Sequence, residues 1–199
     1  MFTCPDKLST LSLQNEFLEG IYSSNNVYFN CFPLERKFIL NCIREVFNKP
    51  NGYSIECYTK WNYSELVGAC LVLPSNQLDR LQLTINHLLL IECMNQKINT
   101  IDVIRQLRIF GKKIEKASTN GFYLYSFFIT KRYRGKKYGA GFLRNCLILI
   151  SHKKSPTDKI QLHVNKENLP ALKIYENLGF EQTQNDEFSF PVFERVIKV

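Results

Sequence analysis

A short basic turn, RGKKYG at residues 134–139, is the first segment whose residue types suggest a chemical role. It follows an almost wholly apolar run at residues 122–130 and precedes a helical pattern that starts near Ala140. The first N–H groups of a helix have no partner inside the helix and carry the positive end of its dipole, so they bind phosphate oxygens. The turn is therefore a candidate cradle for a pyrophosphate group.

A second segment, LHVNKENLPALKIYENLGF at residues 162–180, adds an amide and a phenol to this turn. Asn168 precedes a short helical pattern that Gly179 would end, and Tyr175 lies inside that pattern. A tyrosine hydroxyl can protonate a leaving group as a general acid, or its ring can fill a core. Asn168 likewise suits either a helix cap or a contact to a ligand. Both side chains are candidate site residues.

The net charge of +8 is concentrated around the turn. Residues 112–173 contain fourteen lysines and arginines against three acidic residues, whereas residues 1–111 contain ten of each kind. Such an excess forms either a solvated basic face or a surface for anions. Five of the basic residues lie between Lys131 and Lys137, so they centre on the turn. This favours a small phosphate-bearing ligand, and a nucleic acid is not the expected partner.

Length and composition indicate an ordinary globular chain. With 199 residues and 45% hydrophobic side chains, we expect a single domain. No apolar stretch is long enough to span a bilayer and the N-terminus carries no recognisable export signal, so we expect a cytoplasmic protein without a membrane partner. Seven scattered cysteines indicate reduced thiols and no metal site. Cys146 lies in the apolar phase of its helical pattern, which indicates packing rather than a nucleophile.

Hydrophobic periodicity predicts the elements that must position the candidate residues. Strands are expected at residues 53–61, 66–73, 122–130, 159–164 and 188–199, the first two as an antiparallel hairpin. Helices are expected at residues 11–21, 34–47, 78–89 and 100–116, then after the basic turn and after Asn168. Because a helix separates the strands at 122–130 and 159–164, these two strands are expected to be parallel.

Together these segments resemble the GNAT superfamily of acetyl-CoA-dependent N-acetyltransferases. The resemblance covers residues 122–180 in order and with the family's spacing. Its motifs are the strand FYLYSFFIT, the turn from Arg134 to Gly139 that opens a helix, Asn168 with Ala171, and Ile174-Tyr175 with Gly179-Phe180.

The resemblance implies an α/β (α+β) fold. Its sheet would be mixed and mostly antiparallel, with a parallel, splayed central strand pair and flanking helices. Residues 1–121 would shape the acceptor side, residues 122–180 would form the acetyl-CoA-binding core, and residues 181–199 would add the C-terminal strands.

The resemblance also implies a reaction and a site. Acetyl-CoA would give its acetyl group to a primary amine of a small molecule or protein by direct attack in a ternary complex, and Tyr175 would protonate the leaving thiolate. The groups expected to contact acetyl-CoA are the main chain of Phe127, Phe128 and Ile129, the turn residues Arg134, Gly135, Lys136, Lys137, Tyr138, Gly139 and Ala140, and Asn168. The alternative is a noncatalytic acyl-CoA-binding or protein-interaction module on the same fold.

The group that deprotonates the amine stays open at this point. His163 lies on the expected strand at 159–164, where a histidine is more often structural. The carboxylates Glu56, Glu65 and Glu92 are further candidates, and so is a relay through water.

The turn departs from the family pattern at Lys137, where glycine is usual. Glycine adopts a positive φ freely, whereas a lysine in that conformation costs about 1 kcal/mol. One interpretation is a strained turn with weaker cofactor binding. The other is a turn that keeps a negative φ while Lys137 pairs with a phosphate, and this second arrangement is the one we expect.

Overall fold

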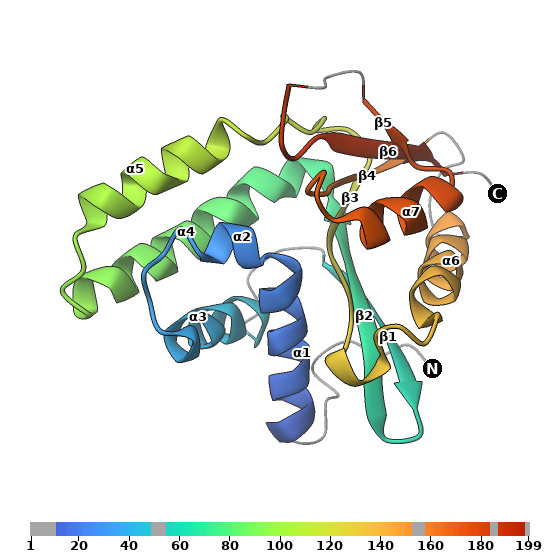
Figure 1. The fold of residues 1–199 in the computed structure, drawn as a ribbon, viewed down its shortest axis with the longest axis horizontal. Helices are drawn as coiled ribbons and strands as arrows, with labels where there is room; N and C mark the ends of the chain where they lie inside the picture. The colour runs from blue at the N-terminus through green and yellow to red at the C-terminus, as the bar shows by residue number, and fades with distance from the viewer. Residues whose placement is uncertain (1–10, 49–54, 153–157, 184–186, 198–199) are drawn as a thin grey trace.

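The computed structural model describes residues 11–48, 55–152, 158–183 and 187–197. Within these ranges six strands form one sheet of order β1-β2-β3-β4-β6-β5, with helices on both of its faces (Figure 1). The strands are β1 Glu56–Asn62, β2 Glu65–Pro74, β3 Phe122–Ile129, β4 Lys159–His163, β5 Glu181–Gln182 and β6 Val192–Val196. The α-helices are α1 Leu11–Ser24, α2 Asn26–Phe29, α3 Arg36–Asn48, α4 Leu78–Asn95, α5 Thr100–Gly111, α6 Tyr138–Ser151 and α7 Leu169–Asn177. Two 3-10 helices are η2 Ser75–Gln77 and η3 Lys131–Tyr133.

The central strand pair β3 and β4 is the parallel one, and the other described neighbours in the sheet are antiparallel. Pairing between β3 and β4 is confined to Phe122 with Ile160 and Tyr123 with Gln161. Beyond Tyr123, β3 continues to Ile129 without pairing to β4. The two strands therefore form a fork, which confirms the predicted mixed sheet with a splayed parallel pair.

Two layers of helices cover the sheet and explain why β3 is almost wholly apolar. Helices α1 to α5 lie on one face, where Tyr123, Tyr125 and Phe128 join their core. Helices α6 and α7 lie on the other face with Leu124 and Phe127 (Figure 1). A strand that is buried on both faces lacks the usual alternation of apolar and polar residues.

A β-bulge at Tyr125 reverses the phase of β3. Leu71 of β2 pairs with Ser126 while Val72 pairs with Leu124, so Tyr125 is the extra residue. Bulges of this kind re-aim the side chains that follow them. As a result Phe127, which lies on the part of β3 that does not pair with β4, faces α6 and α7 instead of α1.

The predicted helix at 100–116 is too long, because α5 ends at Gly111. The residues after it leave the helix to pair with the segment before β6: Glu115 N–H donates to the Phe190 carbonyl, and Phe190 N–H donates to the Lys113 carbonyl. Such long-range backbone bonds outweigh helix propensity, which is worth only tenths of a kcal/mol per residue, about 0.5 or less for most types. Two elements, α2 and β5, were not predicted, because each is too short to show a hydrophobic periodicity.

The other predicted elements are present with shifted ends. Helix α6 begins at Tyr138, two residues before the predicted Ala140. Residues 53 and 54 of the first predicted strand, and residues 198 and 199 of the last, lie outside the described residues. None of the helices in the described ranges is both long and apolar enough to cross a membrane.

Candidate active site at the fork between β3 and β4

A cleft of about 1040 Å³ runs through the fork of the sheet. One wall comes from the ends of β3 and β4 and from α7, and it includes Phe127, Ile129, Asn168 and Tyr175. The opposite wall comes from the α1–α2 junction and from the near ends of α4 and α5. The cleft thus passes from the side of α7 to the side of the N-terminal helices.

Backbone groups at the open edge of β3 face this cleft. Thr130 N–H bonds to the Val67 carbonyl of β2, and opposed residues in an antiparallel pair alternate between exchanging hydrogen bonds and not doing so. The N–H and C=O of Phe128 therefore point to β2, while those of Phe127 and Ile129 point away from it, toward the fork. Of the three predicted main-chain contacts, two are available to a ligand.

Phe128 is the member of the predicted set that the structure turns away. Although it borders the cleft, its ring packs edge-on against Phe17 of α1, with centroids 6.0 Å apart. Its side chain is buried in the core beneath the N-terminal helices. Its contribution is to hold β3 against α1.

The carbonyl of Ile129 already has one partner. The guanidinium Nε of the exposed Arg134 donates a hydrogen bond of 2.9 Å to it. This bond draws the basic turn back toward the open strand edge, so positive charge and unpaired backbone lie at one end of the cleft. A carbonyl oxygen has two lone pairs and can accept a second donor.

The turn itself contains two left-handed residues, which contradicts the predicted negative φ of Lys137. Gly135 has φ +77° and Lys137 has φ +61°, and α6 begins directly after Lys137. Arg134 before them is extended, so the chain has to reverse within three residues to enter the helix. The lysine adopts the conformation that glycine would adopt more easily, and Gly135, Lys136 and Lys137 are all solvent-exposed.

Relief of this strain is measurable. Lys137→Gly should raise the free energy of unfolding by about 0.5–1 kcal/mol, because glycine removes a left-handed penalty of about 1–2 kcal/mol and loses part of the gain to its greater unfolded-state entropy. Urea unfolding of the ligand-free protein measures this change. Lys136→Gly, at a neighbouring position without positive φ, should destabilise instead. Equal effects of the two substitutions would contradict a strained Lys137.

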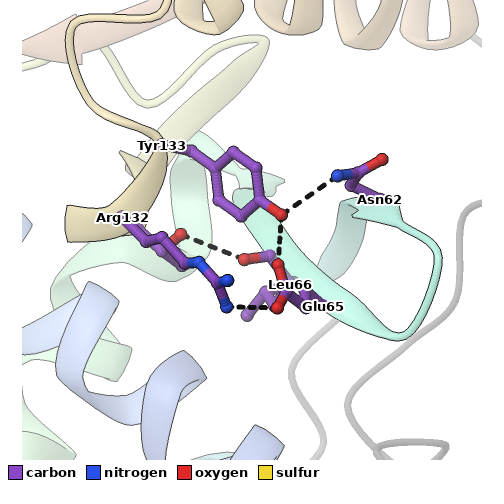
Figure 2. Close-up of polar contacts among 6 residues, drawn as sticks. Asn62, Glu65, Leu66, Arg132 and Tyr133 are labelled. Atoms are coloured by element: carbon purple, nitrogen blue, oxygen red, sulfur yellow. Dashed lines mark hydrogen bonds and ion pairs between the residues drawn. The ribbon is translucent and has the colours of Figure 1, made fainter.

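The tip of the β1–β2 hairpin fixes the approach to the turn (Figure 2). The Tyr133 hydroxyl donates to a carboxylate oxygen of Glu65 and accepts a 3.1 Å hydrogen bond from Asn62 Nδ2. Arg132 forms an ion pair with the same carboxylate. These contacts tie the segment before the basic turn to the tip of the β1–β2 hairpin.

Tyr175 lies in α7 with its ring buried against Phe127 and Phe180, at centroid distances of 6.5 and 5.7 Å. Burial raises the pKa of its hydroxyl, and the neighbouring Cys70 and Tyr123 raise that pKa further. The group therefore carries its proton at neutral pH. Within the described part of the chain the hydroxyl has no hydrogen-bond partner, and the residue lines the cleft.

Asn168 acts as a helix cap. Its Oδ1 accepts a 3.3 Å hydrogen bond from Ala171 N–H in the first turn of α7. Capping uses the oxygen and leaves the Nδ2 donors of an asparagine for another partner. Asn168 lines the cleft, so the predicted cofactor contact is compatible with the cap.

The remaining turn residues adjoin the cleft without lining it. A Cβ atom at Gly139 would lie 3.1 Å from Ile174 Cδ1 and 3.8 Å from Ile129 Cγ1, so α6 starts in close contact with α7 and the end of β3. Tyr138 and Ala140 are half-buried beside it. The structure therefore brings the basic turn, the open edge of β3 and the start of α7 together, as the sequence motifs require.

His163 occupies both of its ring nitrogens. Nε2 lies 2.6 Å from the Glu115 carbonyl, which can only accept, and Nδ1 lies 2.6 Å from the Tyr123 hydroxyl. Burial lowers the pKa of His163 from its ordinary value of 6.5, while hydrogen bonding and the charge of Glu115 oppose that shift in part. The neutral ring donates through Nε2 and accepts from Tyr123 through Nδ1.

Among the cleft residues that were not predicted from the sequence are two tyrosines of β3 and a serine of η2. Tyr123, Tyr125 and Ser75 line the cleft, and in the described structure the Tyr125 and Ser75 hydroxyls are buried without a partner. The available signal was the presence of two tyrosines, two positions apart, in an almost wholly apolar strand. By contrast, Glu56, Glu65 and Glu92 are not among the described residues that line the cleft.

Comparison with known proteins agrees with this architecture. A family model described as an acetyltransferase (GNAT) domain matches residues 85–193, more than half of the chain. The match and the fold are those of an acetyltransferase domain. The chain belongs to the GNAT family.

Solved structures with the same fold are distant in sequence. An N-acetyltransferase from Staphylococcus aureus Mu50 is 13% identical with a TM-score of 0.60, over 91% of this chain and 94% of that one. The PaiA N-acetyltransferase from Thermoplasma acidophilum, solved in complex with coenzyme A, is 14% identical with a TM-score of 0.53, over 98% and 96%. A search of curated proteins finds no significant match.

Proposed function

We propose that the protein transfers an acetyl group from acetyl-CoA to a primary amine by direct attack in a ternary complex. One observation carries this proposal. The fork leaves the N–H and C=O groups of Phe127 and Ile129 unpaired by the sheet, and the proton-bearing Tyr175 lies on the same wall of the cleft, against the Phe127 ring.

The residues present suit coenzyme A. The amides of its pantetheine arm match the open edge of β3, as an added strand matches a sheet edge. The N–H groups at the start of α6, with Lys136 and Lys137 exposed beside them, suit its pyrophosphate. Asn168, which follows both regions in the sequence, lines the same cleft and keeps its Nδ2 donors for a further partner. The coenzyme A complex of the Thermoplasma acidophilum relative supports this assignment at the level of the fold.

The reaction requires three contributions from the chain. The cleft holds the amine and the thioester together, which removes much of the entropic cost of their encounter. An N–H of the β3 edge stabilises the developing oxyanion. As the C–N bond forms and the C–S bond breaks, Tyr175 gives its proton to the departing thiolate sulfur. No covalent enzyme intermediate is needed, in agreement with the complete burial of Cys146.

The acceptor would enter from the side of the N-terminal helices. Residues 1–121 supply the wall formed by the α1–α2 junction, α4 and α5, and residues 122–180 supply the acetyl-CoA side. Acidic and basic residues balance in residues 1–111, so no strongly charged acceptor is favoured. The amine belongs to a small molecule or to a protein.

Transfer of labelled acetyl from acetyl-CoA to a panel of amines tests this function. The panel contains polyamines, amino sugars, aminoglycosides and peptide amino termini. Amine-dependent release of free coenzyme A with equal formation of labelled amide supports the proposal. Tight acetyl-CoA binding without transfer to any of these acceptors would instead support the noncatalytic module.

A further inference from the structure

A hydrogen-bonded pair of side chains closes the base of the fork. Tyr123 is the last residue of β3 that pairs with β4, and His163 lies two positions past its partner Gln161 along β4. The 2.6 Å bond between the Tyr123 hydroxyl and His163 Nδ1 therefore spans the gap where the strands begin to diverge. Both residues line the cleft, and Tyr123 belongs to the core beneath the N-terminal helices.

The direction of this bond follows from its neighbours. Since His163 Nε2 donates to the Glu115 carbonyl, the neutral ring can only accept at Nδ1, and Tyr123 must donate its proton there. The lone pairs of the Tyr123 oxygen then remain available to accept a proton donor in the cleft. An amine nitrogen that attacks the thioester carries such a proton.

The pair also lies close to the proposed acid. Burial raises the pKa of Tyr175, Cys70 raises it further, and the third contribution comes from Tyr123, so the two phenols are electrostatic neighbours. The tyrosines belong to the cores on opposite faces of the sheet, and both line the cleft at the fork. An amine on the acceptor side would face Tyr123, while the thiol side would face Tyr175.

We propose that Tyr123 takes the proton of the attacking amine while passing its own proton to His163 Nδ1. This inference rests on the proposed acetyl transfer. The C–N bond forms, the amine proton moves to the Tyr123 oxygen, the Tyr123 proton moves to His163, and the Tyr175 proton goes to the thiolate as the C–S bond breaks. Solvent takes a proton from His163 and restores one to Tyr175 between turnovers, so protons balance.

The surroundings of His163 suit a transient imidazolium. The Glu115 carbonyl accepts from Nε2 in either charge state, and the Glu115 carboxylate is fixed nearby by hydrogen bonds from Val192 N–H at 2.7 Å and Thr183 Oγ1 at 2.8 Å. Four other charged residues line the described cleft, Asp79, Lys116, Arg134 and Glu167, and all four are solvent-exposed and therefore screened.

Two variants separate proton transfer from structure. Tyr123→Phe keeps the ring and removes the hydroxyl. His163→Gln can keep both hydrogen bonds, because its amide oxygen accepts from Tyr123 and its NH₂ donates to the Glu115 carbonyl, but an amide cannot hold the proton. Each variant should lose about 100-fold or more in kcat, the usual scale of general base catalysis, with acetyl-CoA binding retained.

The pH profile of kcat/KM supplies the readout that a structural role would not change. Below the lowered pKa of His163, the wild type should lose activity through two protons, one on the amine and one on His163. Both variants should show the amine's proton alone. Tyr22→Phe, whose ring stacks on Phe29 and does not belong to the described cleft lining, should keep the two-proton profile.

Each outcome decides between the proposals. If the wild type transfers acetyl and His163→Gln keeps its kcat and two-proton profile, the relay is wrong while the transferase stands, even if Tyr123→Phe fails to fold. If the wild-type protein binds acetyl-CoA but transfers no acetyl group, both the proposed transferase function and the proton relay are wrong.

Discussion

Tyr175→Phe is expected to lower kcat by about 10²–10⁴-fold, the range for loss of a positioned proton donor. Phenylalanine keeps the ring contacts with Phe127 and Phe180, so the shape of the cleft wall is preserved. The dissociation constant of acetyl-CoA should stay unchanged, because the hydroxyl acts only when the C–S bond breaks. Steady-state kinetics together with calorimetric binding of acetyl-CoA measure the two effects separately.

Tyr22→Phe is the control for Tyr175→Phe. Tyr22→Phe removes a hydroxyl from α1, where the ring stacks on Phe29 and does not belong to the described cleft lining. It should leave kcat unchanged. If Tyr175→Phe keeps full kcat, the thiolate takes its proton from elsewhere and Tyr175 is a packing residue.

Gly20→Ala should destabilise the fold by about 2–3 kcal/mol, the scale of overpacking in a dense core. A Cβ atom at this position would lie 2.1 Å from Phe128 Cε2. The Phe128 ring also packs edge-on against Phe17, which limits how far it can move aside. The sign is informative, since Gly→Ala inside a helix normally stabilises by about 0.5–1 kcal/mol. At roughly 2–4 °C per kcal/mol, the midpoint of thermal unfolding should fall by about 4–12 °C.

Gly141→Ala is the matched control for this substitution. Gly141 also lies in a helix, α6, and nothing stands within 4 Å of the position its Cβ would take. It should stabilise the ligand-free protein by up to about 1 kcal/mol. Equal stabilisation by both substitutions would show that α1 does not pack closely on β3 at Phe128. That result would contradict the packing described for this side of the cleft.

Local motifs allowed much of the cleft wall formed by β3, β4 and α7 to be predicted. The two-sided burial of β3 and the glycine-ended helix α7 follow from patterns within a few residues, and the parallel pairing of β3 with β4 follows from the helix between them. The Lys137 prediction was wrong for a physical reason. The side chain favours negative φ, but the reversal between Arg134 and α6 imposes +61°.

Features that join distant parts of the chain could not be read from the sequence. The Tyr123–His163 bond links residues 40 positions apart, and the Tyr133–Glu65 bond links residues 68 apart. The bulge at Tyr125 depends on registry with β2, which no local pattern specifies. These contacts fix which side chains face the fork, so the pairing of Tyr123 with His163 could not be predicted from the sequence.

Thermal unfolding with and without acetyl-CoA tests the central claim most directly, because it needs no knowledge of the acceptor. At about 100 times its dissociation constant, acetyl-CoA should stabilise the protein by about 2.7 kcal/mol, or roughly 5–11 °C. Acetylated pantetheine, which lacks the pyrophosphate, should give a smaller shift at the same concentration. No shift with acetyl-CoA or with longer acyl-CoAs would contradict the assignment of the fork and the basic turn to coenzyme A.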